Sequence, residues 1–146
     1  MDVQIETYSP VEVTALGPKP RVLLAEDDTE ARILFGLCLR SSGYDVVDVS
    51  DGTEALESLV GWPAPDADPA RAFDAAVLDI RMPGFSGLHV LAALRHCTPP
   101  LPVVLMTAFS DERIRMDAYR LGASAMLSKP FRLQALTSAV ACAVGA

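Results

Sequence analysis

The chain has 146 residues, of which 51% are apolar, and it carries a net charge of −7 at pH 7. This length suits one domain with a packed core. The acidic balance argues against direct binding to nucleic acid, and no basic stripe interleaved with aromatic residues opposes that conclusion. No apolar stretch is long enough to span a bilayer, and the first residues lack the basic cluster of a signal peptide. We therefore expect a cytoplasmic protein without membrane contact.

The cysteines Cys38, Cys97 and Cys142 form neither a metal-ligand spacing nor a redox spacing. All three lie in helix-like patterns. We expect them to be buried thiols in a reducing compartment.

Residues 1–20 show no helical period and are punctuated by prolines, so they are expected to form a flexible N-terminal arm. From Arg21 onward, short apolar runs alternate with helical patterns. This alternation predicts a parallel sheet that is covered by helices on both faces, with right-handed crossovers. The predicted strands lie near 21–26, 44–49, 74–79, 102–107 and 124–128, and the predicted helices near 29–41, 52–60, 87–96, 111–121 and 132–144.

Local signals mark several helix ends. Asp28 can cap the first helix, and Ser110 or Asp111 can cap the fourth. Gly43 and Gly122 suit the ends of the first and fourth helices.

A stretch rich in proline and aspartate, at about residues 61–72, separates the second helix from the third strand. It is longer than such connections usually are. We interpret it as a solvent-exposed insertion in which Trp62 packs down as an anchor, with a partner-specific surface as the alternative. The remaining residues, 21–146, are expected to form a single domain.

Polar side chains lie at or just after the ends of four predicted strands. Glu26 and Asp27 follow the first strand, Asp79 ends the third, Thr107 ends the fourth, and Lys129 follows the fifth. The carboxyl ends of parallel strands meet at one edge of the sheet, where open α/β sheets bind ligands. The sequence therefore predicts a site for a cation and a phosphoryl group at this edge.

The residue types indicate how such a site would work. The carboxylates of Glu26, Asp27 and Asp79 repel one another unless a cation lies among them, and oxygen ligands suit Mg²⁺ or Mn²⁺. Asp79 is the best candidate for a nucleophile, because a carboxylate that attacks phosphorus gives an acyl phosphate. Lys129 can place a positive charge on a phosphoryl oxygen, and Thr107 can donate its hydroxyl to the same group.

These residues resemble the receiver domain of two-component response regulators, the CheY-like family. The resemblance covers about residues 21–144 and rests on Leu-Leu-Ala-Glu26-Asp27-Asp, Leu-Asp79-Ile-Arg-Met-Pro-Gly-Phe-Ser-Gly, Met-Thr107-Ala and Ser-Lys129-Pro-Phe. It implies a single domain with the flavodoxin-like (βα)5 fold, a doubly wound parallel sheet with strand order 2-1-3-4-5.

The resemblance also implies a role for each site residue. Asp79 would accept a phosphoryl group from a histidine kinase or a histidine phosphotransfer protein. Mg²⁺ (or Mn²⁺) would be held by Glu26, Asp27, Asp79 and the backbone carbonyl of Arg81. Thr107 and Lys129 would contact the phosphoryl group. The protein would catalyse its own phosphorylation and dephosphorylation rather than act as an enzyme on another substrate.

In the family, movement of the threonine toward the phosphate reshapes the surface that binds a downstream protein. Here that surface would lie within residues 111–144. Met126 stands three residues before Lys129, where the family usually has a tyrosine or phenylalanine that changes rotamer on phosphorylation. Methionine is more flexible, so the usual coupling between the threonine and the aromatic ring is in question.

Two residues that flank the site are expected to set the lifetime of the phosphate. Arg81 lies two residues after Asp79, and Phe109 lies two residues after Thr107. In the family these positions influence the access of the hydrolytic water. The hypothesis is that Arg81 and Phe109 shield the acyl phosphate and slow its loss. The alternative is that both side chains lie on the rim or point into solvent.

We expect a phosphorylatable receiver with no output domain on this chain, either as a complete regulator or as a fragment of a longer protein; its oligomeric state stays open. The alternative function is a protein-interaction module of the same fold that does not use phosphorylation. Met126 and the insertion favour that alternative slightly. An aspartate-nucleophile phosphatase is disfavoured, because Arg81 stands where such enzymes have a general acid.

Overall fold

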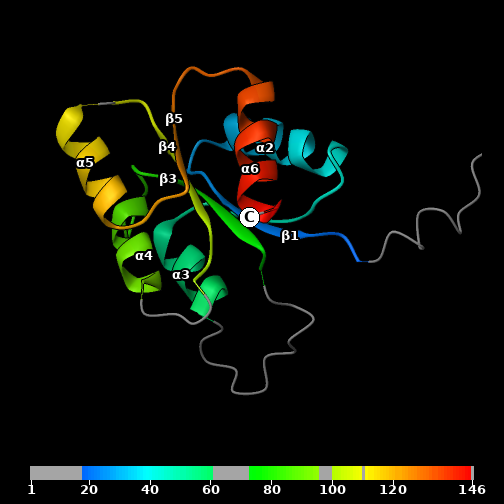
Figure 1. The fold of residues 1–146 in the computed structure, drawn as a ribbon. Coiled ribbons are helices and arrows are strands. Elements are labelled where there is room, and N and C mark those ends of the chain that lie inside the picture. Colours follow the sequence, from blue (N-terminus) through cyan, green and yellow to red (C-terminus); the bar gives the residue numbers. More distant parts are fainter. Residues whose placement is uncertain (1–17, 61–72, 96–99, 110, 146) are drawn as a thin grey trace, which may run out of the picture.

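The computed structural model describes residues 18–60, 73–95, 100–109 and 111–145. The predicted insertion at 61–72 and the predicted arm, apart from residues 18–20, lie outside this part of the chain. The described residues form a five-stranded parallel sheet in the order β2-β1-β3-β4-β5, with helices on both faces (Figure 1). The predicted flavodoxin-like strand order is confirmed.

The bounds of the elements agree with the expected ones to within one or two residues. The strands are β1 (Arg21–Ala25), β2 (Asp45–Val49), β3 (Ala75–Asp79), β4 (Val103–Thr107) and β5 (Ala125–Ser128). The helices are α2 (Thr29–Ser41), α3 (Gly52–Val60), α4 (Gly87–Leu94), α5 (Glu112–Arg120) and α6 (Leu133–Gly145).

Alternate residues of the central strands point to opposite faces of the sheet, because successive side chains of a strand do so. In β1, Val22 and Leu24 belong to a core shared with α2 and α6, whereas Leu23 and Ala25 belong to a core shared with α3, α4 and α5. Figure 1 shows these helices on the corresponding sides of the sheet. A strand buried on both faces needs an unbroken apolar run, which is the pattern that predicted it.

The helix ends follow the local signals. The Asp28 carboxylate accepts a hydrogen bond of 2.9 Å from Ala31 N, and that of Asp111 accepts one of 2.8 Å from Ile114 N. Asp111 is therefore the cap of α5 rather than its first residue. Gly43 (φ 97°) and Gly122 (φ 84°) adopt the left-handed conformation just after α2 and α5, which favours glycine.

The cysteines depart from the expectation. Cys38 is partly buried, and burial raises the pKa of its thiol. Cys142 is exposed, so the expectation of a buried thiol is wrong there: it lies on the outward face of α6. Cys97 lies outside the described residues.

The order of the strands creates a crevice at one edge of the sheet. From β1, the chain crosses first to β2 on one side and then returns to β3 on the other side. The helices that follow β1 and β3 therefore cover opposite faces, and their diverging starts leave a crevice at the carboxyl ends of these two strands. None of the helices in the described ranges is long and apolar enough to cross a membrane.

Candidate functional site

An acidic cluster lies in this crevice. Glu26 follows β1 and Asp79 ends β3, and the parallel register, which pairs Ala25 with Leu78, brings the two residues side by side. Carboxylate oxygens of Glu26, Asp27 and Asp79 all lie within 4.8 Å of one another. The side chains differ in exposure, because Glu26 and Asp79 are buried whereas Asp27 is exposed.

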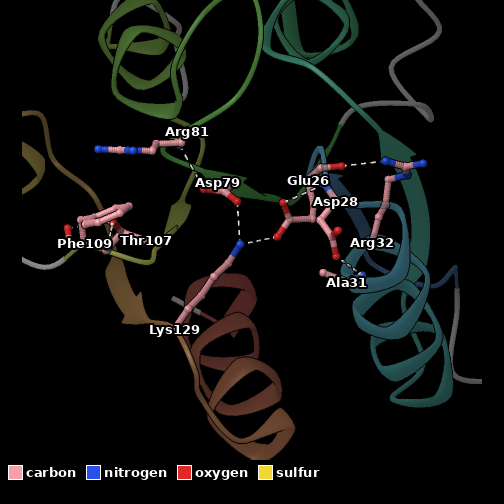
Figure 2. Close-up of polar contacts among 9 residues, drawn as sticks. All are labelled: Glu26, Asp28, Ala31, Arg32, Asp79, Arg81, Thr107, Phe109 and Lys129. Atoms are coloured by element: carbon pink, nitrogen blue, oxygen red, sulfur yellow. Dashed lines mark hydrogen bonds and ion pairs between the residues drawn. The ribbon is translucent and has the colours of Figure 1, made fainter.

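The Lys129 ammonium joins the two buried carboxylates. Its Nζ lies 2.6 Å from Asp79 Oδ2 and also donates a hydrogen bond to Glu26 Oε1 (Figure 2). Lys129 follows β5, and its backbone N–H donates to Thr107 O at 2.7 Å, which extends the pairing of β4 with β5. The Lys129–Pro130 peptide bond is cis. The predicted meeting of Glu26, Asp79 and Lys129 at one sheet edge is therefore confirmed.

The charges of this cluster are interdependent. Burial and the neighbouring Asp79 raise the pKa of Glu26 to about 7, although the Lys129 ammonium opposes that rise. For Lys129, burial lowers the pKa of the ammonium, but hydrogen bonds and charge interactions with Asp79 and Glu26 outweigh burial and raise it. A cation is thus already favoured between these carboxylates.

Arg32 is a residue of the site that the sequence did not indicate. Its Nη1 donates a hydrogen bond of 2.8 Å to the backbone oxygen of Glu26, and its Nε lies 3.5 Å from the carboxylate of Asp48 on β2 (Figure 2 shows the contact with Glu26). Arg40 reaches the same Asp48 carboxylate at 3.1 Å. An arginine in the first turns of a helix is common on solvated surfaces, so nothing in the sequence distinguished Arg32.

Thr107 lies at the carboxyl end of β4, with its hydroxyl directed to its own chain. The hydroxyl donates to Phe109 O at 2.9 Å and accepts from Phe109 N at 3.0 Å. Among the described residues, it forms no hydrogen bond with Asp79 or Lys129. Thr107 thus lies at the carboxyl end of the strand next to β3, and its hydroxyl is engaged with the loop that follows β4.

Arg81 and Phe109 contact each other at the mouth of the site. The guanidinium carbon of Arg81 lies 4.0 Å from the centroid of the Phe109 ring, and both side chains are exposed (Figure 2). The backbone N–H of Arg81 donates a hydrogen bond of 3.0 Å to Asp79 Oδ1. The geometry thus places the two exposed side chains together on the rim.

Beside this pair, a groove of about 470 Å³ leads to the acidic cluster, lined by Asp27, Ile80, Arg81, Met82, Pro83 and Ser86. Met126 on β5 is partly buried and packs against the core on the α3, α4 and α5 side of the sheet. Its side chain therefore belongs to that core and not to the lining of this groove.

Known proteins resemble this chain in sequence. It is 38% identical over 119 residues to the transcriptional activator protein PfeR of Pseudomonas aeruginosa, covering 82% of this chain and 36% of PfeR. It is also 38% identical over 121 residues to the transcriptional regulatory protein PrrA of Mycobacterium tuberculosis, covering 83% of this chain and 48% of PrrA. The chain thus spans less than half the length of these relatives.

Solved structures resemble it as well. A response regulator receiver domain protein from Clostridium thermocellum is 25% identical and superposes with a TM-score of 0.75 over 86% of this chain and 94% of the other. The non-phosphorylated HemR receiver domain of Leptospira biflexa is 27% identical, with a TM-score of 0.73 over 88% of this chain and 96% of the other. The family model of the response regulator receiver domain matches residues 22–141. With the fold and the acidic cluster described above, this match shows that the chain belongs to the response regulator receiver domain family.

Proposed function

We propose that this protein accepts a phosphoryl group on Asp79 in a reaction that depends on Mg²⁺, and that phosphorylation changes its contacts with other proteins. The observation that carries the proposal is the position of the Asp79 carboxylate. It is buried at the end of β3, 2.6 Å from the Lys129 ammonium and next to the carboxylates of Glu26 and Asp27. Membership of the receiver family supports this assignment.

The residues of the acidic cluster fit a hard divalent cation. Mg²⁺ (or Mn²⁺) would be held by the carboxylates of Glu26, Asp27 and Asp79, together with the backbone carbonyl of Arg81. All these donors are oxygens, and the carboxyl groups outnumber the single ammonium of Lys129. When bound, the ion would offset the negative charge of the attacking carboxylate and of the phosphoryl oxygens.

The proposed reaction transfers phosphorus from nitrogen to oxygen. A carboxylate oxygen of Asp79 attacks the phosphorus of a phosphohistidine, the new O–P bond replaces the N–P bond, and the released imidazole takes up a proton. Lys129 is positioned to attract a phosphoryl oxygen, because its ammonium already lies against Asp79. Thr107 would supply a second donor once its hydroxyl leaves Phe109. Later attack by water on phosphorus would release inorganic phosphate and restore Asp79.

The partners follow from this chemistry. The donor would be a histidine kinase or a histidine phosphotransfer protein. The downstream protein would bind at residues 111–144, which include α5, β5 and all but the last residue of α6. On α5, Met116 and Tyr119 are exposed apolar or aromatic side chains, and Tyr119 is 81% exposed. Such side chains are typical of protein interfaces.

Intact mass after incubation with acetyl phosphate tests the proposed function. The parent protein should gain one phosphoryl group in the presence of Mg²⁺ and none with a chelator, whereas Asp79→Asn should gain none. Asp111→Asn is the matched control, because asparagine also caps a helix and Asp111 lies outside the acidic cluster.

A parent protein that stays unmodified with both acetyl phosphate and a phosphorylated histidine donor would contradict the proposal. That result would favour the alternative of an interaction module that does not use phosphorylation. Equal modification of the parent and Asp79→Asn would assign the phosphoryl group to a different residue.

A further inference from the structure

A chain of contacts runs from the acceptor carboxylate to the Thr107 hydroxyl through the two rim residues. Arg81 N donates to Asp79 Oδ1 at 3.0 Å, and the Arg81 guanidinium lies 4.0 Å from the centre of the Phe109 ring. The backbone of Phe109 in turn holds the Thr107 hydroxyl through two hydrogen bonds, of 2.9 and 3.0 Å. Figure 2 shows Arg81 extended over the Phe109 ring, with Thr107 beside it.

The Thr107 hydroxyl has a single proton, which it donates to Phe109 O. A phosphoryl group on Asp79 would bring strong acceptor oxygens to the carboxyl edge of the sheet. The hydroxyl can donate to such an oxygen only if it gives up Phe109 O, and its rotation also removes the acceptor of Phe109 N–H. Turning Thr107 toward the phosphoryl group therefore requires the backbone of Phe109 to find other partners.

The contact of the Phe109 ring with Arg81 would oppose that movement. The ring is 52% exposed, so it is not fixed by burial in the core. A guanidinium over the face of an aromatic ring is attracted by the ring quadrupole. At an exposed position this attraction corresponds to about a two- to fivefold bias in an equilibrium.

We propose that the stack of Arg81 on Phe109 is a latch that keeps the Thr107 hydroxyl on the Phe109 backbone in the unphosphorylated protein. Phosphorylation opens the latch from both ends. The phosphoryl oxygens attract the Thr107 hydroxyl at one end, and at the other end they attract the Arg81 guanidinium away from the ring. This inference rests on the proposed function of Asp79 and assigns the two rim residues a role in setting the resting state.

The latch differs from a shield in what it requires of residue 109. A shield needs only bulk over the acyl phosphate, which leucine supplies nearly as well as phenylalanine. A latch needs an aromatic face, which tyrosine keeps and leucine lacks. Phe109→Leu and Phe109→Tyr therefore form a matched pair that separates the two roles without changing the charge of the protein.

Titration with beryllium fluoride, which stands in for a phosphoryl group on a carboxylate, tests the latch. The affinities of the Phe109 variants, with and without Arg81→Ala, form a double-mutant cycle. NMR spectra of the backbone amides in the Mg²⁺-saturated protein would report the dissociation constant for beryllium fluoride. We expect Phe109→Leu to bind about two- to fivefold more tightly than the parent, because the resting state loses its latch. Phe109→Tyr should bind as the parent does. In the Arg81→Ala variant, adding Phe109→Leu should leave the dissociation constant for beryllium fluoride unchanged. This comparison holds even if Arg81→Ala alone changes that constant.

Hydrogen exchange of the residue 109 amide, measured without beryllium fluoride, gives a second readout. Its rate is divided by the intrinsic exchange rate of each variant's local sequence. It should be faster in Phe109→Leu than in the parent, since the hydrogen bond to Thr107 opens more often. The latch would be overturned if Phe109→Leu and the parent bound beryllium fluoride equally well. It would also be overturned if Phe109→Leu raised this affinity by the same factor in the Arg81→Ala variant. Either result would leave the role of Asp79 intact. A parent protein that binds no beryllium fluoride would overturn the proposed function and the latch with it.

Discussion

The two sides of the site are held in opposite ways. On the side of β1 and β3, Glu26 and Asp79 are buried and share the Lys129 ammonium. On the side of β4, Thr107 bonds to its own loop, and that loop contacts Arg81 through an exposed stack. The first side is fixed by charges that would repel one another without a cation. The second is held by weak contacts, so it is the side that can move when the charge on Asp79 changes.

The largest expected effect comes from removing the shared cation. Lys129→Met should lower the rate of phosphorylation by acetyl phosphate about a hundredfold, as loss of a preorganised charged contact does. Lys129→Arg should be intermediate, because it keeps the charge but not the compact ammonium. Lys19→Met, which removes an exposed lysine, is the matched control. The rates can be measured by intact mass over time. A Lys129→Met rate within threefold of the parent would show that the ammonium is dispensable.

A smaller effect is expected from Arg32, which holds the backbone of Glu26 from outside the cluster. Arg32→Ala should weaken Mg²⁺ binding about tenfold, because groups that orient metal ligands commonly contribute that much. Arg40→Ala is a close control, since Arg40 also pairs with Asp48 but donates no hydrogen bond to Glu26. Calorimetric titration with Mg²⁺ would give both affinities. An equal loss in Arg40→Ala would assign the effect to Asp48 and not to Glu26.

The smallest effect is expected on the exposed side. Arg81→Ala should lower the free energy of unfolding by no more than about 1 kcal/mol, the upper value for a cation–π contact between exposed groups. In metal-free buffer, Lys129→Met should lower the free energy of unfolding by more, about 3 kcal/mol, because it leaves two buried carboxyl groups without their cation. Urea denaturation of the two variants and the parent would compare them. If Arg81→Ala lowered the free energy of unfolding more than Lys129→Met does, the side of β4 would be the more strongly held one, contrary to the comparison above.

The sequence by itself determined the fold and the fixed side of the site. The apolar runs of β1, β3 and β4 require burial on both faces, which only a parallel sheet between two helical layers supplies. Once those strands are parallel, the residues at their carboxyl ends must share one edge. Their shared edge therefore followed from strand direction, whereas the contacts among Glu26, Asp79 and Lys129 also depend on the strand order that the family resemblance implied. Caps such as Asp28 were equally local, since they depend on neighbouring residues.

Only the tertiary structure decided the contacts that depend on side-chain direction. Arg32 lies on an ordinary helix turn, and its hydrogen bond to the backbone oxygen of Glu26 depends on how α2 packs beside β1 and β2. The hydroxyl of Thr107 could have faced Asp79 or its own loop, and spacing could not choose between them. Arg81 and Phe109 lie 28 residues apart in the numbering and meet only because β3 and β4 are neighbours. Long, flexible side chains at a surface reach many partners, so their pairing is set by the packed backbone and not by the residue pattern.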